Sequence, residues 1–191
     1  MKKTDAKAPV IVGVSGASGS IYALRLLQIL QEIQVPTHLV MSKAAELALS
    51  LETDLKSSDF KALANKVYRV SDVGAAIASG SFVSRGMIIA PCSVRTWSEI
   101  ATGVTSSLLT RAADVTLKEQ RKLVLMVRES PLHLGHLRSL TTLSEMGAVI
   151  APPVPAFYLK PQNLEEMVDH TVQRVLDCFD LAPADSKRWN P

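Results

Sequence analysis

A short apolar segment that runs directly into a glycine-rich turn and then into a helical pattern is the strongest constraint in this sequence. Residues 10–14 read VIVGV, which is typical of a buried β-strand, and residues 20–33 carry apolar side chains at helical spacing. The connection contains three glycines and two serines: Gly13, Gly16, Gly19, Ser15 and Ser18. Such a turn presents backbone N–H groups and hydroxyls at a helix N-terminus, where a phosphate can bind. The G-x-x-G-x-x-G spacing matches neither the dinucleotide fingerprint nor a P-loop, so a tight turn without a ligand remains the alternative.

The rest of the chain repeats the same alternation of strands and helices. Further strands are predicted at 37–41, 67–70, 86–90, 123–127 and 148–150, and helices at 42–50, 61–65, 93–101, 107–118, 132–146 and 163–179. We expect Pro91 to stop the strand over 86–90. Short all-apolar strands separated by helices predict an α/β fold, a three-layer doubly wound parallel sheet of Rossmann-like or flavodoxin-like type. With no linker or repeat, the 191 residues are expected to form one domain, of which residues 1–8 are flexible.

In such a fold, ligands bind beyond the carboxyl ends of the strands, so the residues that follow each strand are informative. These are Ser15–Gly19, Ser42 and Lys43, Pro91–Thr96, Arg128–Pro131 and Pro152–Tyr158. Ser42 and Ser93 are placed to cap the helices that follow them, and Arg128 directly follows an apolar strand. None of the first three segments carries the acidic residue that binds the ribose of NAD. The pattern favours a different phosphate-bearing ligand.

Composition excludes several classes of function. The net charge of +3 is scattered, and no aromatic residues interleave with a basic stripe, which argues against nucleic acid. No apolar run approaches the length of a membrane span and no signal sequence is evident, so a cytoplasmic protein is expected. Cys92 and Cys178 are interpreted as reduced thiols, and Cys92 as structural rather than nucleophilic. His133 and His136 have no third partner in view, so no metal is expected.

Eight sequence blocks, taken in order, resemble the UbiX/Pad-type flavin prenyltransferases over nearly the whole chain. They are GVSGASG, SKAAELALSLETD, ASGSF, PCSVRT, LLTRAADVTLKE, LVLMVRESPLHLGHL, GAVIAPPVPAFY and the terminal RW. This family was formerly described as 3-polyprenyl-4-hydroxybenzoate or aromatic-acid decarboxylases. The resemblance implies transfer of a dimethylallyl group from dimethylallyl monophosphate to N5 and C6 of reduced FMN. The product, prenylated FMN, would pass to a UbiD-type decarboxylase, and the enzyme would be a homododecamer with active sites at subunit junctions.

The resemblance also implies roles for individual residues. FMN would be bound by Gly16, Ala17, Ser18, Ser42, Ser93, Val94, Arg95, Thr96 and Arg128. The prenyl phosphate would be bound by Tyr158, Arg174 and Lys118, and Trp189 would help residues 180–191 to close the site. The residues expected to take part in catalysis are Glu52, Lys118, Arg128 and Ser18, with Glu52 able to move a proton. The sequence departs from the family pattern at Gln120 and Lys122 and at Trp97.

The residue types suit this chemistry. No Asp-rich magnesium motif is present, so a monophosphate neutralised by Arg, Lys and Tyr is the expected substrate. Three alternatives remain open: a flavin-dependent aromatic-acid decarboxylase, a non-catalytic flavin-binding subunit of a decarboxylase, and an NADP reductase. The glycine spacing counts against the reductase.

Overall fold

The computed structural model describes residues 7–184, 186 and 188, and its centre is a six-stranded parallel sheet with the strand order β3-β2-β1-β4-β5-β6. The strands are β1 (Val10–Val14), β2 (Thr37–Met41), β3 (Lys66–Tyr68), β4 (Gly86–Cys92), β5 (Lys122–Val127) and β6 (Val149–Ile150). β1 lies between β2 and β4, and the direction of winding reverses there. This is the Rossmann-type doubly wound order, which decides between the two topologies that the sequence left open.

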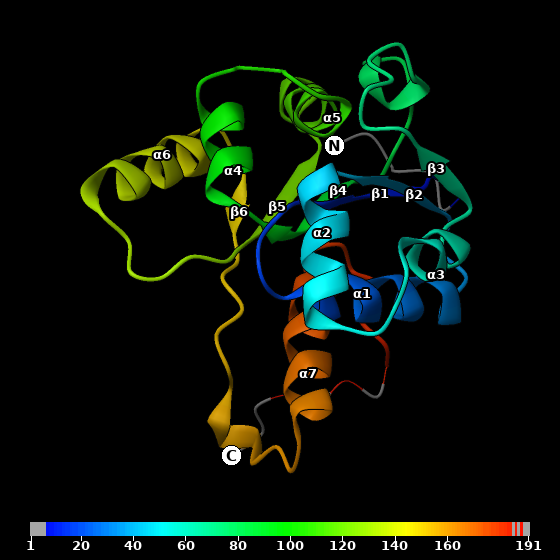
Figure 1. Cartoon of the computed structure of the whole chain (residues 1–191), viewed down its shortest axis with the longest axis vertical. Helices are drawn as coiled ribbons and strands as arrows, with labels where there is room; N and C mark the ends of the chain where they lie inside the picture. Colours follow the sequence, from blue (N-terminus) through cyan, green and yellow to red (C-terminus); the bar gives the residue numbers. More distant parts are fainter. Residues whose placement is uncertain (1–6, 185, 187, 189–191) are drawn as a thin grey trace.

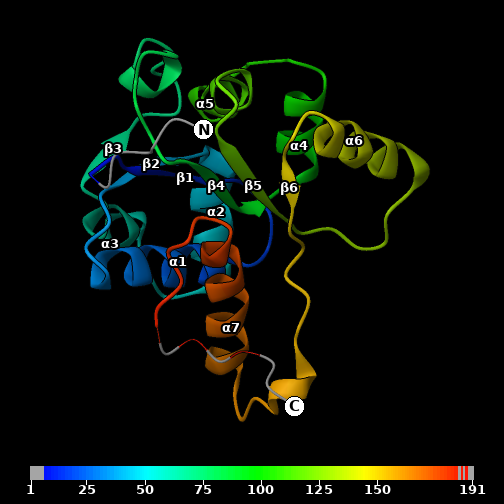
Figure 2. The ribbon, with the colours of Figure 1, turned by 180° about the vertical axis from the view of Figure 1, so that it is seen from behind.

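Helices cover both faces of the sheet, as the two views in Figures 1 and 2 show. They are α1 (Ser20–Glu32), α2 (Lys43–Glu52), α3 (Ser57–Ala62), α4 (Val94–Ala101), α5 (Leu108–Lys118), α6 (Leu134–Glu145) and α7 (Leu164–Asp177), with the short 3-10 helices η1 (Ala76–Ala78) and η2 (Phe157–Leu159). One apolar core joins α1 and α7 to the sheet, and a second joins α4 and α5 to the opposite face. None of the described helices is long and apolar enough to cross a membrane.

The strands are buried because both faces are covered. Every residue of β1 and of β4 is buried, and their apolar side chains alternate between the two cores. The α7 helix shows the complementary pattern, with Val168, Val172 and Val175 buried at helical spacing against the core shared with α1. Between β6 and α7 the chain forms an extended arm, residues 151–163, that leads away from the sheet (Figure 2).

Several predicted bounds differ from the structure: the strand predicted at 67–70, for example, spans Lys66–Tyr68. Two of the differences have a clear physical cause. The fourth strand does not stop at Pro91 but continues to Cys92, which pairs with Val127 across a register shift. Proline removes only its own N–H donor, and the carbonyl oxygen of Pro91 still accepts a hydrogen bond from the backbone N–H of Ser15 at 3.2 Å.

The helix predicted at 61–65 instead spans Ser57–Ala62. The carboxylate of Asp59 accepts a hydrogen bond from the backbone N–H of Lys56 at 2.8 Å and so fixes an earlier start. Asn65 lies beyond the helix, where its side-chain oxygen accepts a hydrogen bond from the N–H of Thr37 at 2.8 Å.

Candidate active site

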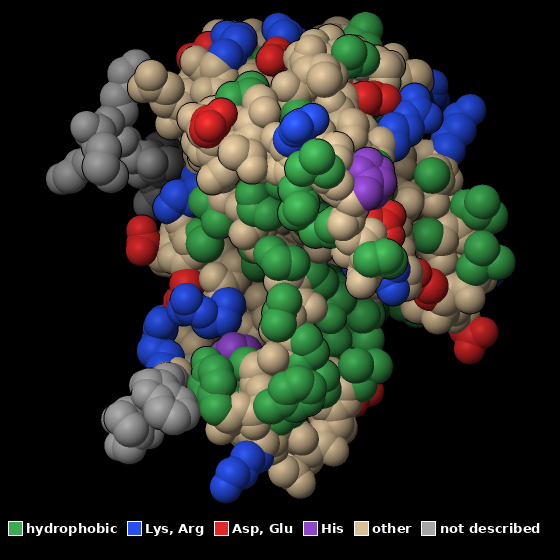
Figure 3. Space-filling view, turned by 90° about the vertical axis from the view of Figure 1, so that its left-hand side faces the viewer, with side chains coloured by type: hydrophobic (Ala, Val, Ile, Leu, Met, Phe, Trp, Pro, Cys, Tyr) green, Lys and Arg blue, Asp and Glu red, His purple; other side chains and the backbone are tan. Residues whose placement is uncertain are grey.

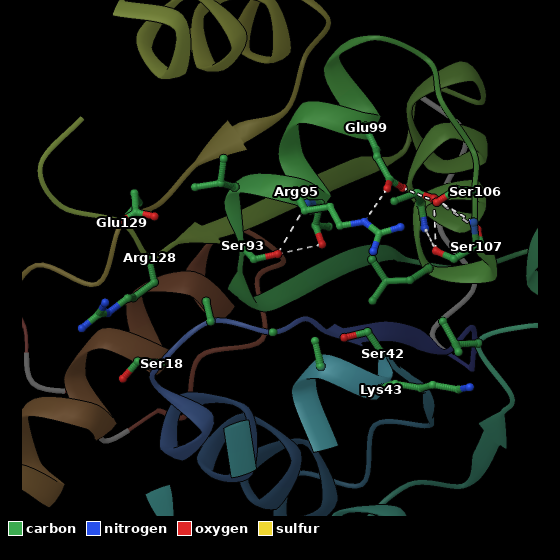
Figure 4. A pocket seen from close by; sticks show the side chains of 18 residues that line it. Ser18, Ser42, Lys43, Ser93, Arg95, Glu99, Ser106, Ser107, Arg128 and Glu129 are labelled. Atoms are coloured by element: carbon green, nitrogen blue, oxygen red, sulfur yellow. Dashed lines mark hydrogen bonds and ion pairs between the residues drawn. The ribbon is translucent and has the colours of Figure 1, made fainter. Parts of the chain in front are cut away.

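A cavity of about 510 Å³ lies at the carboxyl ends of the neighbouring strands β1 and β4. The strand order reverses between these two strands, so the cavity lies at the switch point of the fold. Its size is within the range of about 300–1,000 Å³ that is usual for small-molecule sites. The lining includes all nine residues predicted to bind FMN: Gly16, Ala17, Ser18, Ser42, Ser93, Val94, Arg95, Thr96 and Arg128. In Figure 4, Ser18 and Arg128 lie at one end of the cavity and Lys43 and Ser107 at the other, with Ser42 and Ser93 between them.

Three helix N-termini with serine caps border this cavity. The side chains of Ser42, Ser93 and Ser107 cap α2, α4 and α5, each accepting a hydrogen bond from the backbone N–H three residues later. Helix N-termini carry partial positive charge and unpaired N–H groups, and both favour an anion. The sequence predicted the first two caps; the third joins them because the fold brings α5 back to the same edge of the sheet.

Ser15 ties the glycine turn to the end of β4. Its buried hydroxyl donates a hydrogen bond to the carbonyl oxygen of Pro91 and accepts one from the backbone N–H of Ser93, both at 2.8 Å. The first strand and the start of α4 therefore keep a fixed relation on either side of the cavity. Ser15 acts as a brace between these walls, whereas Ser18 lines the cavity itself.

Glu52 lies next to the Ser18 end of the cavity without lining it. Its carboxylate accepts hydrogen bonds from the backbone N–H groups of Gly19 and Ser20, at 3.0 and 2.9 Å, at the N-terminus of α1. Burial alone would raise the pKa of Glu52, but these backbone bonds and the hydroxyls of Ser18 and Ser20 outweigh it and lower the pKa. Glu52 is thus held as a carboxylate one hydrogen bond away from a residue of the cavity wall.

Sequence reasoning missed part of the wall opposite that end. Glu99 accepts hydrogen bonds from Ser106 at 2.7 Å and from Arg95 at 2.8 Å. Burial would raise the pKa of Glu99, but the bonds from Ser106 and Arg95 outweigh it and lower the pKa. Both Glu99 and Ser106 line the cavity. The available signal was Ser107 followed three residues later by Thr110, a capping pattern that marks the start of α5 next to this wall.

The residues predicted to bind the prenyl phosphate do not line this cavity within one chain. Lys118 ends α5, about 12 Å along the helix axis from Thr110 in the cavity wall at 1.5 Å per residue. Tyr158 lies on η2 in the extended arm, and Arg174 lies in the last turn of α7. Trp189 is outside the described residues. The roles of these four residues remain predictions.

Two other candidate groups take structural positions. Cys92 is fully buried and desolvation raises its pKa, as expected for a structural thiol rather than a nucleophile. His133 caps α6 by accepting a hydrogen bond from the backbone N–H of His136, and the two rings stack at 3.5 Å between centroids. Among residues 7–184, 186 and 188, no three His, Cys, Asp or Glu side chains group together as metal ligands would.

Comparison with known proteins agrees with this geometry. The family model described as Flavoprotein matches residues 1–176, so the fold and the cavity belong to a flavoprotein. The relatives include flavin prenyltransferase UbiX of Thauera aromatica, 55% identical over 94% of this chain and 93% of the relative. UbiX of Escherichia coli K12 is 56% identical over 94% of this chain and 97% of the relative. The chain belongs to the UbiX flavin prenyltransferase family.

Solved structures superpose on almost the entire chain. AnUbiX (PadA1), in complex with FMN and dimethylallyl pyrophosphate, has a TM-score of 0.95 at 45% identity and covers 97% of this chain and 98% of that one. A dodecameric FMN-dependent UbiX-like decarboxylase from Escherichia coli O157:H7 has a TM-score of 0.93 at 46% identity and covers 96% and 100% of the two chains.

Proposed function

We propose that this protein transfers a dimethylallyl group from dimethylallyl monophosphate to N5 and C6 of reduced FMN and releases prenylated FMN. The observation that carries the proposal is the cavity at the switch point, bordered by three capped helix N-termini and the glycine turn, in a member of the UbiX family. The product would serve a UbiD-type decarboxylase. We also place the enzyme in the cytoplasm, which suits its two free cysteines.

The cavity fits a flavin mononucleotide. A Cβ atom at Gly16 would lie 2.3 Å from the Cβ of Ala44, so only glycine keeps the turn this close to α2 and leaves its backbone facing the cavity. The N-termini at Ser42 and Ser93 supply N–H groups for a single phosphate. Bound reduced FMN supplies the electron-rich ring that the dimethylallyl group alkylates, so the protein needs no nucleophile of its own.

The protein itself supplies charged side chains that stabilise the leaving phosphate and a carboxylate that can accept a proton. Arg128 lies at one end of the cavity, beside Glu129 (Figure 4). We assign Arg128 to the flavin, and Lys118, Tyr158 and Arg174 to the phosphate that departs as the allylic C–O bond breaks. Each hydrogen bond between a charged group and the phosphate contributes about 1.5–3 kcal/mol. Because negative charge accumulates on the leaving group, these contacts lower the barrier for bond breaking. Glu52, bonded to Ser18, is placed to hold or pass on the proton released from the flavin.

Lys118, Tyr158 and Arg174 do not line the cavity within one chain, so we propose that a second copy of the chain supplies them. Exposed apolar side chains favour such an assembly: Leu134, Leu137, Met146, Val154 and Phe157 on α6, the arm and their connections are 45–72% exposed. Figure 3 shows hydrophobic side chains gathered over the lower half of one face of the molecule. An apolar surface of this kind is typical of a protein interface. We therefore propose a closed homo-oligomer, with a dodecamer as the expected state.

The decisive experiment is anaerobic incubation of the protein with reduced FMN and dimethylallyl monophosphate, followed by mass analysis of the flavin. The expected mass increase is that of one dimethylallyl group less one hydrogen, because the flavin loses a proton as the group is added. A parallel reaction with dimethylallyl pyrophosphate tests the choice of phosphate, because the AnUbiX structure holds the pyrophosphate. Release of carbon dioxide from an aromatic acid by this protein alone, with no modified flavin, would favour the decarboxylase instead.

Light scattering tests the proposed homo-oligomer, and a fully active monomer would contradict it.

A further inference from the structure

One side of α7 carries a line of polar side chains that leads from the arm to Arg188. His170, Arg174 and Asp177 follow one another at spacings of four and three residues, so they lie along one face of the helix. The ring of Tyr158 meets the ring of His170 edge-on, with 6.1 Å between centroids. At the other end of the line, Asp177 binds Arg188. Two of the residues assigned to the prenyl phosphate therefore lie along this face: Tyr158 against His170, and Arg174 one turn further along the helix.

Asp177 is the centre of this set. One of its carboxylate oxygens accepts a hydrogen bond from the guanidinium of Arg174, and Arg188 donates to both of its oxygens, at 2.6 and 3.2 Å. The side chain of Asp177 is only 19% exposed, whereas those of Arg174 and Arg188 are 59% and 60% exposed. The carboxylate is therefore the more shielded and better fixed partner. Both arginines depend on it for their position.

Asp177 is also a poor choice for helix stability alone. It is the last residue of α7, where the helix dipole favours cations and disfavours a carboxylate. Arg174, in the same turn, already satisfies the dipole. Two guanidinium groups offset the unfavourable position of Asp177.

We propose that Asp177 is a positioning residue: it holds Arg174 in the orientation that binds the prenyl phosphate, and it holds Arg188 at the same point. This inference rests on the proposed function, because it takes Arg174 as a ligand of the phosphate. It adds that the binding of the allylic substrate and the position of Arg188 depend on one carboxylate. Flavin binding, at the cavity that Asp177 does not line, is independent of it.

The test compares Asp177→Asn, Asp177→Glu and Asp169→Asn in the full-length, assembled protein. Asp169→Asn is the matched control, because Asp169 lies on the same helix and pairs with Arg25 on α1 instead of with Arg174. Asp177→Asn keeps the size of the side chain but removes its charge, and Asp177→Glu restores the charge. KM for dimethylallyl monophosphate, kcat and the Kd for FMN are measured for each. Trypsin cleavage at Arg188, followed by intact mass, reports the docking of that residue without reference to activity.

We expect Asp177→Asn to raise KM for dimethylallyl monophosphate by about two- to fivefold, the range of a partly screened ion pair, and to leave the Kd for FMN unchanged. It should also speed cleavage at Arg188, and Asp177→Glu should recover part of both effects. Asp169→Asn should change neither. A KM for Asp177→Asn equal to or below that of the wild type would overturn the role of Asp177, as would an equal increase for Asp169→Asn. If the wild type forms no prenylated FMN, the proposed function itself fails and the role of Arg174 fails with it.

Discussion

Replacing Gly16 by alanine should damage the flavin site through one steric contact. Gly16 is not among the residues with positive φ, so alanine can adopt its backbone conformation, and the effect comes from the side chain alone. The added Cβ atom would lie 2.3 Å from the Cβ of Ala44 and 3.0 Å from its carbonyl carbon. Carbon atoms normally approach to about 3.5–4.0 Å. The glycine turn and α2 must therefore separate by roughly 1 Å.

Neither the glycine turn nor α2 can move freely. The N–H of Ser42 is bound to the carbonyl oxygen of Val14 at 2.9 Å, and the hydroxyl of Ser42 caps α2 by accepting from Ala45 at 3.0 Å. These bonds hold the start of α2 to the end of β1. Overpacking a fixed contact of this kind costs about 1–3 kcal/mol. Because Gly16 and Ala44 both line the cavity, we expect much of this cost to appear in flavin binding, as a rise in the Kd for FMN of about ten- to a hundredfold.

Fluorescence titration of FMN, together with thermal unfolding, measures both effects. Gly74→Ala is the control, because its added Cβ would meet only Oδ1 of Asp72 at 3.8 Å and its φ is not positive. That substitution should stabilise the protein slightly, by about 0.4–1 kcal/mol, through a less flexible unfolded chain. A Gly16→Ala protein whose FMN affinity and unfolding temperature match those of Gly74→Ala would refute the argument that the turn is packed against α2.

Four further substitutions test other parts of the site. Ser15→Ala should lower the unfolding temperature, because the partly buried N–H of Ser93 loses its acceptor, at a cost of up to about 1–3 kcal/mol. Each kcal/mol corresponds to about 2–4 °C, and unchanged calorimetry would contradict the bracing role. Glu52→Gln should destabilise the protein at neutral pH but not in acid. The folded-state pKa of Glu52 is lowered from 4.5, so the stabilisation by its carboxylate is present above pH 4.5 and is lost as the pH falls through the folded-state pKa. Urea unfolding at a series of pH values measures this loss. Arg174→Ala should cut turnover of dimethylallyl monophosphate by about ten- to a hundredfold and leave FMN affinity intact. Ser18→Ala should instead weaken FMN binding first. Unchanged kinetics for Arg174→Ala would show that this arginine only forms an ion pair on the helix surface.

The sequence by itself determined the elements whose cause is local. The strand over 37–41 has the predicted bounds, and the helix caps at Ser42 and Ser93 form as expected, because apolar runs and capping hydroxyls act within a few residues. It also predicted that the glycine turn and the serine caps would lie together, and they line one cavity, since parallel strands all end at the same edge of a sheet. The start of α3 and the end of β4 were misjudged, because the carboxylate of Asp59 and the partner strand of Cys92 decided them.

Only the tertiary structure decided which of these pieces meet. The strand order places β4 beside β1, and Ser15 then bridges two segments that are 78 residues apart in the chain. Glu99 and Ser106 enter the cavity wall for the same reason, since their contact depends on how α4 and α5 pack on the sheet. Arg174, by contrast, lies away from the cavity. Its residue type suggests a phosphate ligand, yet the fold of the single chain places it with Asp177 on an exposed helix face. A local pattern fixes what a residue can bind, but long-range packing within and between chains fixes which groups come within reach of it.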